Sequence, residues 1–320
     1  MGGDNLRILF MGTPDFALFS LRALCEEDGQ DTVVGVLTQP DKPKGRGYAL
    51  TPPPVKVYAE RRGIPVYQPQ TLRDGAIEDI LHKLDPELII VVAYGKILPR
   101  YVLEYPKHGC INIHASLLPR YRGAAPMQRA IMEGETVSGV TSMYMAEGLD
   151  TGDMLFCEKA EILPDDDFEA VHDKLGAAGG RVLLRTLDAL RRGALHPIKQ
   201  DDALATYAHK IEKEECRLDF AQDARRLSNK IRALSPFPLA YTTFANGKKL
   251  KIVRAAAEAG NFDAAPGTVI CADRGGVRVA CGSGCLCLTR FRPEGKGEQS
   301  AADLLNGRQI AVGDILGREV

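Results

Sequence analysis

Short apolar runs alternate with amphipathic stretches over the first two-thirds of the chain. The runs at 7–11, 32–38, 88–93, 110–114 and 140–145 have the length of buried strands. Apolar residues recur at helical spacing in the stretches 54–62, 76–84, 125–133 and 168–192. Near-continuous apolar strands separated by helices indicate an α/β fold with a doubly wound, mostly parallel sheet. Thr13 is expected to cap the first helix, with Pro14 at its first position.

The pattern changes in the last third of the chain. A basic amphipathic helix is expected at 223–234, followed by short strands at 241–245, 249–253, 268–272, 277–280 and 285–291. Asn246-Gly247 between the first two strands is a strong hairpin signal, and Ser300 with Asp303 predicts a capping box before a last helix. Five short strands with helices predict a small β-barrel of the oligonucleotide-binding (OB) kind.

Composition and charge refine this division. The 320 residues, 45% hydrophobic and 26% charged, are ordinary for globular domains. Gly, Pro and charged residues at 193–204 indicate a linker, so we expect domains at 1–192 and 207–320 joined by residues 193–206. Residues 207–320 carry 18 Lys/Arg and 13 Asp/Glu, a balance of +5, which leaves −6 on residues 1–206. This asymmetry is a modest indication of a polyanionic partner, and an uneven solvated surface explains it equally well.

Neither the N-terminal residues nor the cysteines indicate export. The N-terminus lacks a positively charged secretory start, and the apolar run 88–93 is far below the roughly 20 residues of a membrane span. We therefore expect a cytoplasmic protein that does not enter a membrane and whose eight cysteines are reduced. Cys281, Cys285 and Cys287 are crowded but lack the second pair or nearby His of a zinc site, so we expect packed strand cysteines and no metal.

Two polar residues emerge together where the strand 110–114 leaves the sheet. Asn112 and His114 are two positions apart and point to the same side of that strand. Ligands bind at the carboxyl edge of open parallel sheets, and an amide donor beside an imidazole suits acyl chemistry. The common alternatives are an Asn that bonds its own backbone and a structural His.

The segments 111–126, INIHASLLPRYRGAAP, and 148–153, GLDTGD, resemble the signature of the folate-dependent formyltransferases. The resemblance extends over essentially the whole chain, including residues 9–16, 39–47 and 91–95 in the same order, and is closest to the branch acting on methionyl-tRNA. It implies transfer of the formyl group of 10-formyltetrahydrofolate to the α-amino group of initiator methionyl-tRNA. It also implies a Rossmann-like catalytic domain and an OB-like, tRNA-binding C-terminal domain.

The resemblance implies roles for individual residues. Asn112 would stabilise the oxyanion, His114 would accept the proton or act as a charged second donor, and Asp150 would orient His114. Asp153 would be structural, although either aspartate could simply form an Asx turn. The folate pocket would use Ser116, Leu117, Leu118, Pro119, Tyr94 and Gly95. The two leucines beside the proline could equally be plain core.

Cations on two parts of the chain are the implied tRNA contacts. Lys42, Lys44 and Arg46 lie on a Gly/Pro-rich loop at the ligand edge, although charged loops are usually only solvated. In the second domain the implied contacts are Lys210, Lys213, Arg232, Lys248 and Lys249. Where relatives commonly carry Trp, the chain has other aromatic residues that keep a ring and lose the indole donor: Tyr121, Phe220 and Phe237.

Two other functions remain open at this point. A folate formyltransferase could act on a small amine, such as an amino sugar nucleotide or a ribosylamine. A relative could also bind RNA without catalysis. The cationic loop and the second domain favour tRNA over a small amine, and the intact trio Asn112, His114 and Asp150 argues against a non-catalytic protein. We expect a monomer without an obligate protein partner.

Overall fold

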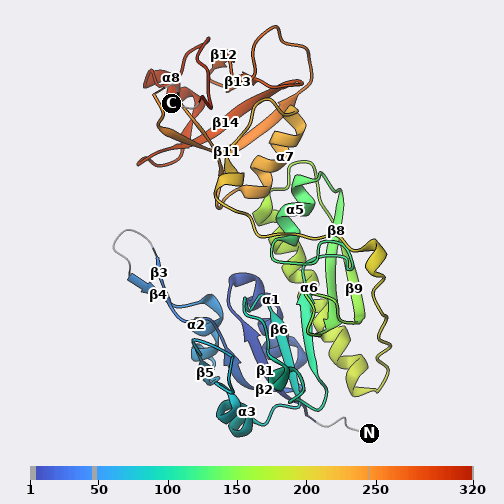
Figure 1. Ribbon diagram of the computed structural model, residues 1–320. Helices are drawn as coiled ribbons and strands as arrows, with labels where there is room; N and C mark the ends of the chain where they lie inside the picture. Colours follow the sequence, from blue (N-terminus) through green and yellow to red (C-terminus); the bar gives the residue numbers. More distant parts are fainter. Residues whose placement is uncertain (1–4, 45–48, 245, 319–320) are drawn as a thin grey trace. The chain divides into compact units, whose positions relative to one another are not determined.

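The computed structural model describes residues 5–44, 49–244 and 246–318. The chain forms two compact units (Figure 1). The first comprises Met1–Gly123, Val137–Glu161 and His172–Ala208, and the second comprises Ala124–Thr136, Ile162–Val171 and His209–Val320. Two short excursions of the chain, 124–136 and 162–171, therefore group with the C-terminal segment.

A seven-stranded sheet forms the centre of the first unit. Its strands in spatial order are β5 (Val66–Tyr67), β2 (Thr32–Leu37), β1 (Arg7–Gly12), β6 (Leu88–Val92), β7 (Cys110–His114), β8 (Val137–Tyr144) and β9 (Met154–Glu161). The strands from β5 to β7 are parallel, and β8 is antiparallel to both β7 and β9. The chain order reverses between β1 and β6, which creates the switch point where α/β sheets bind ligands.

Helices cover both faces of this sheet, as the pattern predicted. One face packs Leu9, Met11 and Cys110 with residues of α3 (Glu78–Leu84) and α4 (Arg100–Leu103). On the other face, Gly179 of α6 (Phe168–Arg191) lies against Ile113 and Val140. A Cβ at Gly176 would come within 2.4 Å of the Phe19 ring of α1 (Asp15–Arg22), so glycine there allows α1 and α6 to pack closely. The mostly parallel, doubly wound fold is confirmed.

The start of α1 differs from the prediction. Pro14 is the N-cap, and no side chain caps the helix. The Thr13 hydroxyl instead donates to the Tyr94 carbonyl (3.1 Å) and accepts the backbone N–H of Gln39 (3.2 Å). The predicted cap was wrong because two neighbouring strand ends use this hydroxyl. After β2, the chain of the first unit forms a short antiparallel pair, β3 (Lys42–Lys44) and β4 (Ala49–Thr51), and then helix α2 (Pro54–Arg61).

The second unit is an antiparallel sheet around its own core. The path is β10 (Ala240–Thr243), β11 (Lys249–Glu258), β14 (Cys285–Pro293), β13 (Gly276–Ala280) and β12 (Val269–Asp273), with β15 (Gln299–Ser300) paired to β14. Leu250, Val277 and Leu288 are fully buried in this core together with Leu227 of α7 (Ala224–Leu234). The small C-terminal antiparallel domain predicted from the sequence is thus confirmed.

The helix starts in this unit follow local rules. Asp223 caps α7 by accepting the N–H groups of Arg225 and Arg226. Ser300 and Asp303 form the predicted capping box of α8 (Ala301–Asn306). Helix α5 (Pro126–Met132) belongs to the same unit. Across the ranges that the structure describes, no helix is both long and apolar enough to cross a membrane.

Candidate active site

Strand β7 presents Asn112 and His114 on one face. Asn112 is paired with Val91 of β6 and Met143 of β8, and His114 with Thr141 of β8. His114 is buried, with 7% of its surface exposed, and its Nε2 lies 3.0 Å from the Tyr121 carbonyl oxygen. Asn112 is half-buried, and no residue within the described ranges hydrogen-bonds its carboxamide. The amide is therefore available to a ligand, and the imidazole is held.

Asp150 comes to His114 from the loop that follows β8. Its Oδ2 lies 3.7 Å from His114 Nδ1 and accepts the N–H of Gly123 at 2.8 Å. The two imidazole nitrogens thus face two oxygen acceptors, the Asp150 carboxylate and the Tyr121 carbonyl. An imidazolium formed at His114 would have an acceptor within hydrogen-bond distance of Nε2 and a carboxylate 3.7 Å from Nδ1.

The loop 116–119 is fixed by hydrogen bonds to β8. Thr141 Oγ1 donates to the Ser116 carbonyl at 2.7 Å and accepts the Leu118 N–H at 3.2 Å. Ser116 and Leu118 are buried, while Leu117 and Pro119 are half-buried. A Cβ on Gly139 would lie 2.5 Å from Leu117 Cδ2, so the leucine packs directly over that glycine. This segment is a rigid wall beside His114.

The other predicted folate residues, Tyr94 and Gly95, lie at the end of β6 beside the switch point. The Tyr94 side chain turns into the core under α3 and α4, so its carbonyl, not its ring, faces the sheet edge. Gln39 Nε2 donates to the Tyr94 carbonyl (3.0 Å) and to the Gly95 carbonyl (3.1 Å). Gly95 has φ +81°, and a Cβ there would come within 2.4 Å of Gln39 Nε2. Sequence reasoning did not single out Gln39.

The predicted cationic loop begins at a well-anchored base. Asp41 accepts hydrogen bonds from Lys56 (2.9 Å) and Gln68 (2.8 Å), which lower the pKa of its carboxyl, the Gln68 bond contributing most. Lys42 Nζ donates to Gln39 Oε1 at 2.8 Å. Lys44 pairs with Ala49 through β3 and β4, and Arg46 lies outside the described residues. A cavity of about 230 Å³ opens between this base and Thr13.

The predicted cations of the second unit have different environments. Lys249 lies 4.7 Å from the centre of the Tyr241 ring, and Lys248 is exposed. Lys210 lies 3.6 Å from Glu212, and Lys213 precedes a short helical turn, Glu214–Cys216. Arg232 instead donates to the backbone carbonyls of Leu163 and Asp166 within the unit, and burial lowers its pKa. Its guanidinium therefore already has a structural use.

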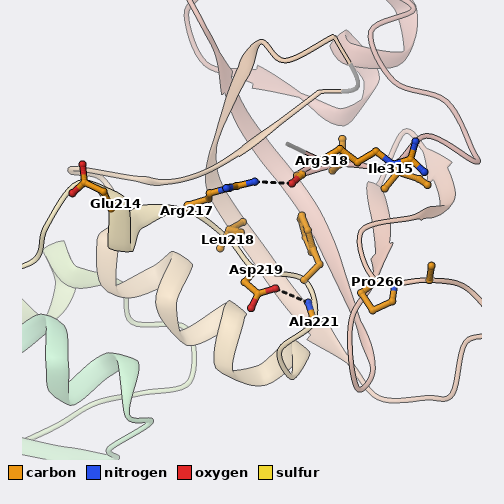
Figure 2. A pocket seen from close by; sticks show the side chains of 12 residues that line it. Glu214, Arg217, Leu218, Asp219, Ala221, Pro266, Ile315 and Arg318 are labelled. Atoms are coloured by element: carbon orange, nitrogen blue, oxygen red, sulfur yellow. Dashed lines mark hydrogen bonds between the residues drawn. The ribbon is translucent and has the colours of Figure 1, made fainter. Parts of the chain in front are cut away.

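The second unit also contains a cavity of about 740 Å³, shown in Figure 2. Arg217 crosses it and donates to the Gly317 carbonyl at 2.8 Å, and the Asp219 carboxylate accepts the Ala221 N–H at 3.0 Å. None of the predicted catalytic or folate-binding residues lines it. Cys281, Cys285 and Cys287 are buried in this unit, Cys285 and Cys287 on β14. In the described parts of the chain, no group of three or more potential ligands could hold a metal ion.

Two residues that the sequence reasoning did not assign complete the surroundings of Asp150. Arg122 is 2% exposed, and Gln200 is 5% exposed. Gln200 binds both Arg122 and the backbone of the Asp150 loop. Arg122 belongs to the signature segment, whereas nothing in the local pattern around Gln200 distinguishes it from the rest of the predicted linker.

Comparison with known proteins matches both parts of the chain. Residues 6–187 match the family model "Formyl transferase", and residues 210–309 match "Formyl transferase, C-terminal domain". Methionyl-tRNA formyltransferase of Citrifermentans bemidjiense is 48% identical over 316 residues, which are 98% of each chain. That of Ectopseudomonas mendocina is 49% identical over 317 residues, 98% of this chain and 99% of the relative.

A solved structure shares the fold at lower identity. HypX from Aquifex aeolicus in complex with tetrahydrofolic acid superposes with a TM-score of 0.64 at 21% identity. The match covers 96% of this chain and 48% of that chain, so this chain spans about half the length of HypX.

Proposed function

Because the chain belongs to the methionyl-tRNA formyltransferase family, we propose that it transfers the formyl group of 10-formyltetrahydrofolate to the α-amino group of initiator methionyl-tRNA. The observation that carries this proposal is identity near 48% with relatives of that name over 98% of the chain. A small amine as acceptor is not favoured, because the similarity continues through the whole C-terminal domain.

The proposed reaction is direct attack of the free amine on the formyl carbon. A free α-amino group has a pKa of about 7.7–8.0, so the nucleophile needs little activation. Asn112 would donate to the oxygen as it becomes negative, which is supported by its free carboxamide. His114 would take the amine proton, and the Asp150 carboxylate would stabilise the imidazolium. The intermediate then collapses by breaking the bond between the formyl carbon and N10, and N10 is protonated.

The oxyanion role of Asn112 predicts a specific kinetic loss. Replacing Asn112 with Ala should lower kcat about 10²–10³-fold, the range for removal of one oxyanion donor. The KM values for both substrates should change little, because the bond forms mainly in the transition state. Asn261→Ala, at an exposed position of the second unit, is the matched control. An effect confined to KM in steady-state kinetics would remove Asn112 from this role.

The binding sites are proposed along the sheet edge and on the second unit. The folate would lie between the wall 116–119, the backbone of Tyr94 and Gly95, and the Asp150 loop. Lys42, Lys44 and Arg46 would enter the acceptor arm of the tRNA, where cations contact phosphates. The second unit would add a less specific set: Lys210, Lys213, Arg232, Lys248 and Lys249. The arginine in this set, Arg232, would contribute only if it released its carbonyl partners.

The proposal extends to organisation and location. Residues 1–192 would form the catalytic domain, 193–206 the linker and 207–320 the OB-like tRNA-binding domain. The matched family regions, 6–187 and 210–309, support these limits. We propose that the enzyme works as a monomer in the cytoplasm, without a metal ion.

The decisive experiment is formyl transfer from 10-formyltetrahydrofolate to charged initiator tRNA, with charged elongator methionyl-tRNA assayed alongside. Transfer to the initiator alone is the expected result. No transfer to either tRNA by a protein that binds the folate would redirect the search to a small-amine acceptor.

A further inference from the structure

We propose that Gln200 is a positioning residue that holds Asp150 beside His114 for formyl transfer. This inference rests on the proposed catalytic role of Asp150. Gln200 lies in the segment that the sequence predicts to be a linker, 50 residues after Asp150. Its side chain is nevertheless buried, with only 5% of the residue exposed. A buried polar side chain in a linker needs a reason, because burial without hydrogen bonds costs about 1–3 kcal/mol.

The reason lies in the partners of its carboxamide. Gln200 Nε2 donates to the carbonyl of Asp150 at 2.8 Å and to the carbonyl of Gly152 at 2.7 Å. Its Oε1 accepts from Nε of Arg122 at 3.0 Å and from the terminal nitrogen Nη2 at 2.9 Å. Both donor hydrogens and both acceptor sites are therefore used. An amide side chain provides this combination, whereas a carboxylate has no donor and an ammonium has no acceptor.

The Asp150 loop requires such an external tie. Asp150 has φ +51°, in the left-handed region that is uncommon outside glycine and that Asp and Asn enter more readily than other residues. Leu149 just before it is 60% exposed, so the outer part of the loop has little packing of its own. Gly152 approaches β8 so closely that a Cβ would lie 1.7 Å from the Tyr144 carbonyl oxygen. Gln200 binds the loop at the two residues where its path is most constrained.

Arg122 connects the same carboxamide to the loop on the other side of His114. Its neighbours contact the proposed catalytic pair, because the Tyr121 carbonyl faces His114 Nε2 and the Gly123 N–H binds Asp150 Oδ2. The Arg122 backbone exchanges hydrogen bonds with Thr206 (2.8 Å) and Ala208 (2.7 Å). The segment 200–208 thus fastens both loops that flank the imidazole.

The distance between Asp150 and His114 makes this fastening important for catalysis. At 3.7 Å, Asp150 Oδ2 is slightly beyond hydrogen-bond distance from His114 Nδ1. A shift of a few tenths of an ångström decides whether the carboxylate engages the imidazole. Gln200 binds the backbone carbonyl of Asp150, so it fixes the backbone that carries this carboxylate.

The test is a double-mutant cycle on the full-length enzyme. Gln200→Met removes both donors and the acceptor at similar length, and it should lower kcat about 10²-fold, the cost of a misplaced catalytic group. The KM for methionyl-tRNA should stay within about twofold, since Gln200 is not among the proposed tRNA contacts. In an Asp150→Asn background, the same change should lower kcat by less than about twofold, because two residues that act as a unit are not additive.

A second variant and a control complete the design. Gln200→Glu keeps the acceptor for Arg122, loses the donors to the Asp150 loop and places a carboxylate oxygen against the two carbonyls, so kcat should fall at least as far as in Gln200→Met. Gln30→Met, at an exposed glutamine before β2, is the matched control and should retain wild-type kinetics. Thermal melts of all variants separate loss of fold from loss of rate.

Two results would overturn the inference while leaving the proposed function intact. One is wild-type kcat in both Gln200 variants, and the other is a full additional loss of kcat when Gln200→Met is combined with Asp150→Asn. A wild-type enzyme that transfers no formyl group to methionyl-tRNA would instead overturn the proposed function itself.

Discussion

At the scale of single residues, the backbone and the side chain of Tyr94 have different roles. Its carbonyl accepts hydrogen bonds from Thr13 and Gln39 at the ligand edge of the sheet. Its phenol is buried, with 1% of the residue exposed, and burial raises the pKa of the hydroxyl to about 12. Within the described residues, that hydroxyl has no hydrogen-bond partner. The ring therefore stabilises the fold through packing, whereas the buried hydroxyl without a partner lowers the free energy of unfolding.

We expect Tyr94→Phe to stabilise the protein by about 1 kcal/mol, because it removes an unsatisfied buried hydroxyl and keeps the ring. Urea unfolding measures the change, and the KM for 10-formyltetrahydrofolate should be unaltered because the backbone carbonyl is retained. Tyr144→Phe, at a half-buried position on β8, serves as the control for loss of a phenol. A destabilised Tyr94→Phe protein would show that the hydroxyl has a partner in solution.

At the scale of elements, the packing of α6 on α1 includes a histidine between two carboxylates. His172 Nε2 lies 3.4 Å from Asp15 Oδ1 at the start of α1, and its Nδ1 lies 2.9 Å from Asp173 Oδ1. The contact with Asp15 is the largest effect on the pKa of His172, and together with Asp173 it outweighs burial and raises that pKa above its usual value of 6.5. The protonated imidazole therefore stabilises this junction.

The raised pKa predicts the pH range in which His172 matters. The contribution to the free energy of unfolding should be fully present below about pH 6.5 and lost as the pH rises through the higher pKa of the folded state. Chemical unfolding of the wild type and His172→Gln at pH 6 and pH 9 should show a larger difference at pH 6. A difference in the free energy of unfolding that grew with pH would contradict this assignment. His196→Asn, at an exposed position, is the control.

The hairpin of β3 and β4 is a second element whose position depends on a few contacts at its base. Lys56, on α2, and Gln68 hold Asp41 immediately before β3. Lys56→Met should loosen this base and raise the KM for methionyl-tRNA roughly twofold to fivefold, the range of a partly exposed ion pair. Arg46→Ala should weaken tRNA use through the same loop. The KM for the folate should not change in either variant, and Lys107→Met is the exposed control.

The elements show which parts of the fold could be predicted and why. Strand β7 has the predicted bounds, because a continuous apolar run between turns defines a buried strand. The pattern missed β5, which has two residues, and β9, an edge strand with three charged residues among its last four. Strand β11 continues to Glu258, five residues beyond its apolar run, because β14 pairs along it. The local sequence pattern of a strand does not indicate which distant segment will pair with it.

The same limit separates the predictable and unpredictable parts of the candidate site. Asn112 and His114 could be placed together because strand periodicity alone puts them on one face. The contact of Asp150 with His114 came from the resemblance, and the structure brings their atoms to 3.7 Å. Gln200 could not be found, since its partners are 50 and 78 residues away and its neighbours have linker composition.

At the scale of the whole molecule, the charge is divided between the two parts of the chain. Residues 207–320 carry +5 and residues 1–206 carry −6. An enzyme that binds a polyanion and a small folate with different surfaces should respond differently to salt for each substrate. Release of counterions from the tRNA makes its binding strongly dependent on ionic strength, whereas a small ligand in a pocket releases few.

We therefore expect the KM for methionyl-tRNA to rise about 10²-fold between 50 and 200 mM salt, the change for roughly four phosphate contacts. The KM for 10-formyltetrahydrofolate should change less than about threefold over the same range. Replacing Lys248 and Lys249 with Gln should lower the slope of log KM for methionyl-tRNA against log salt concentration by the amount expected for about two phosphate contacts. The kcat at saturating tRNA should be unchanged. Equal salt dependence for the two substrates would mean that tRNA is held mainly by uncharged contacts, and the basic balance of the C-terminal part would then have no role in binding.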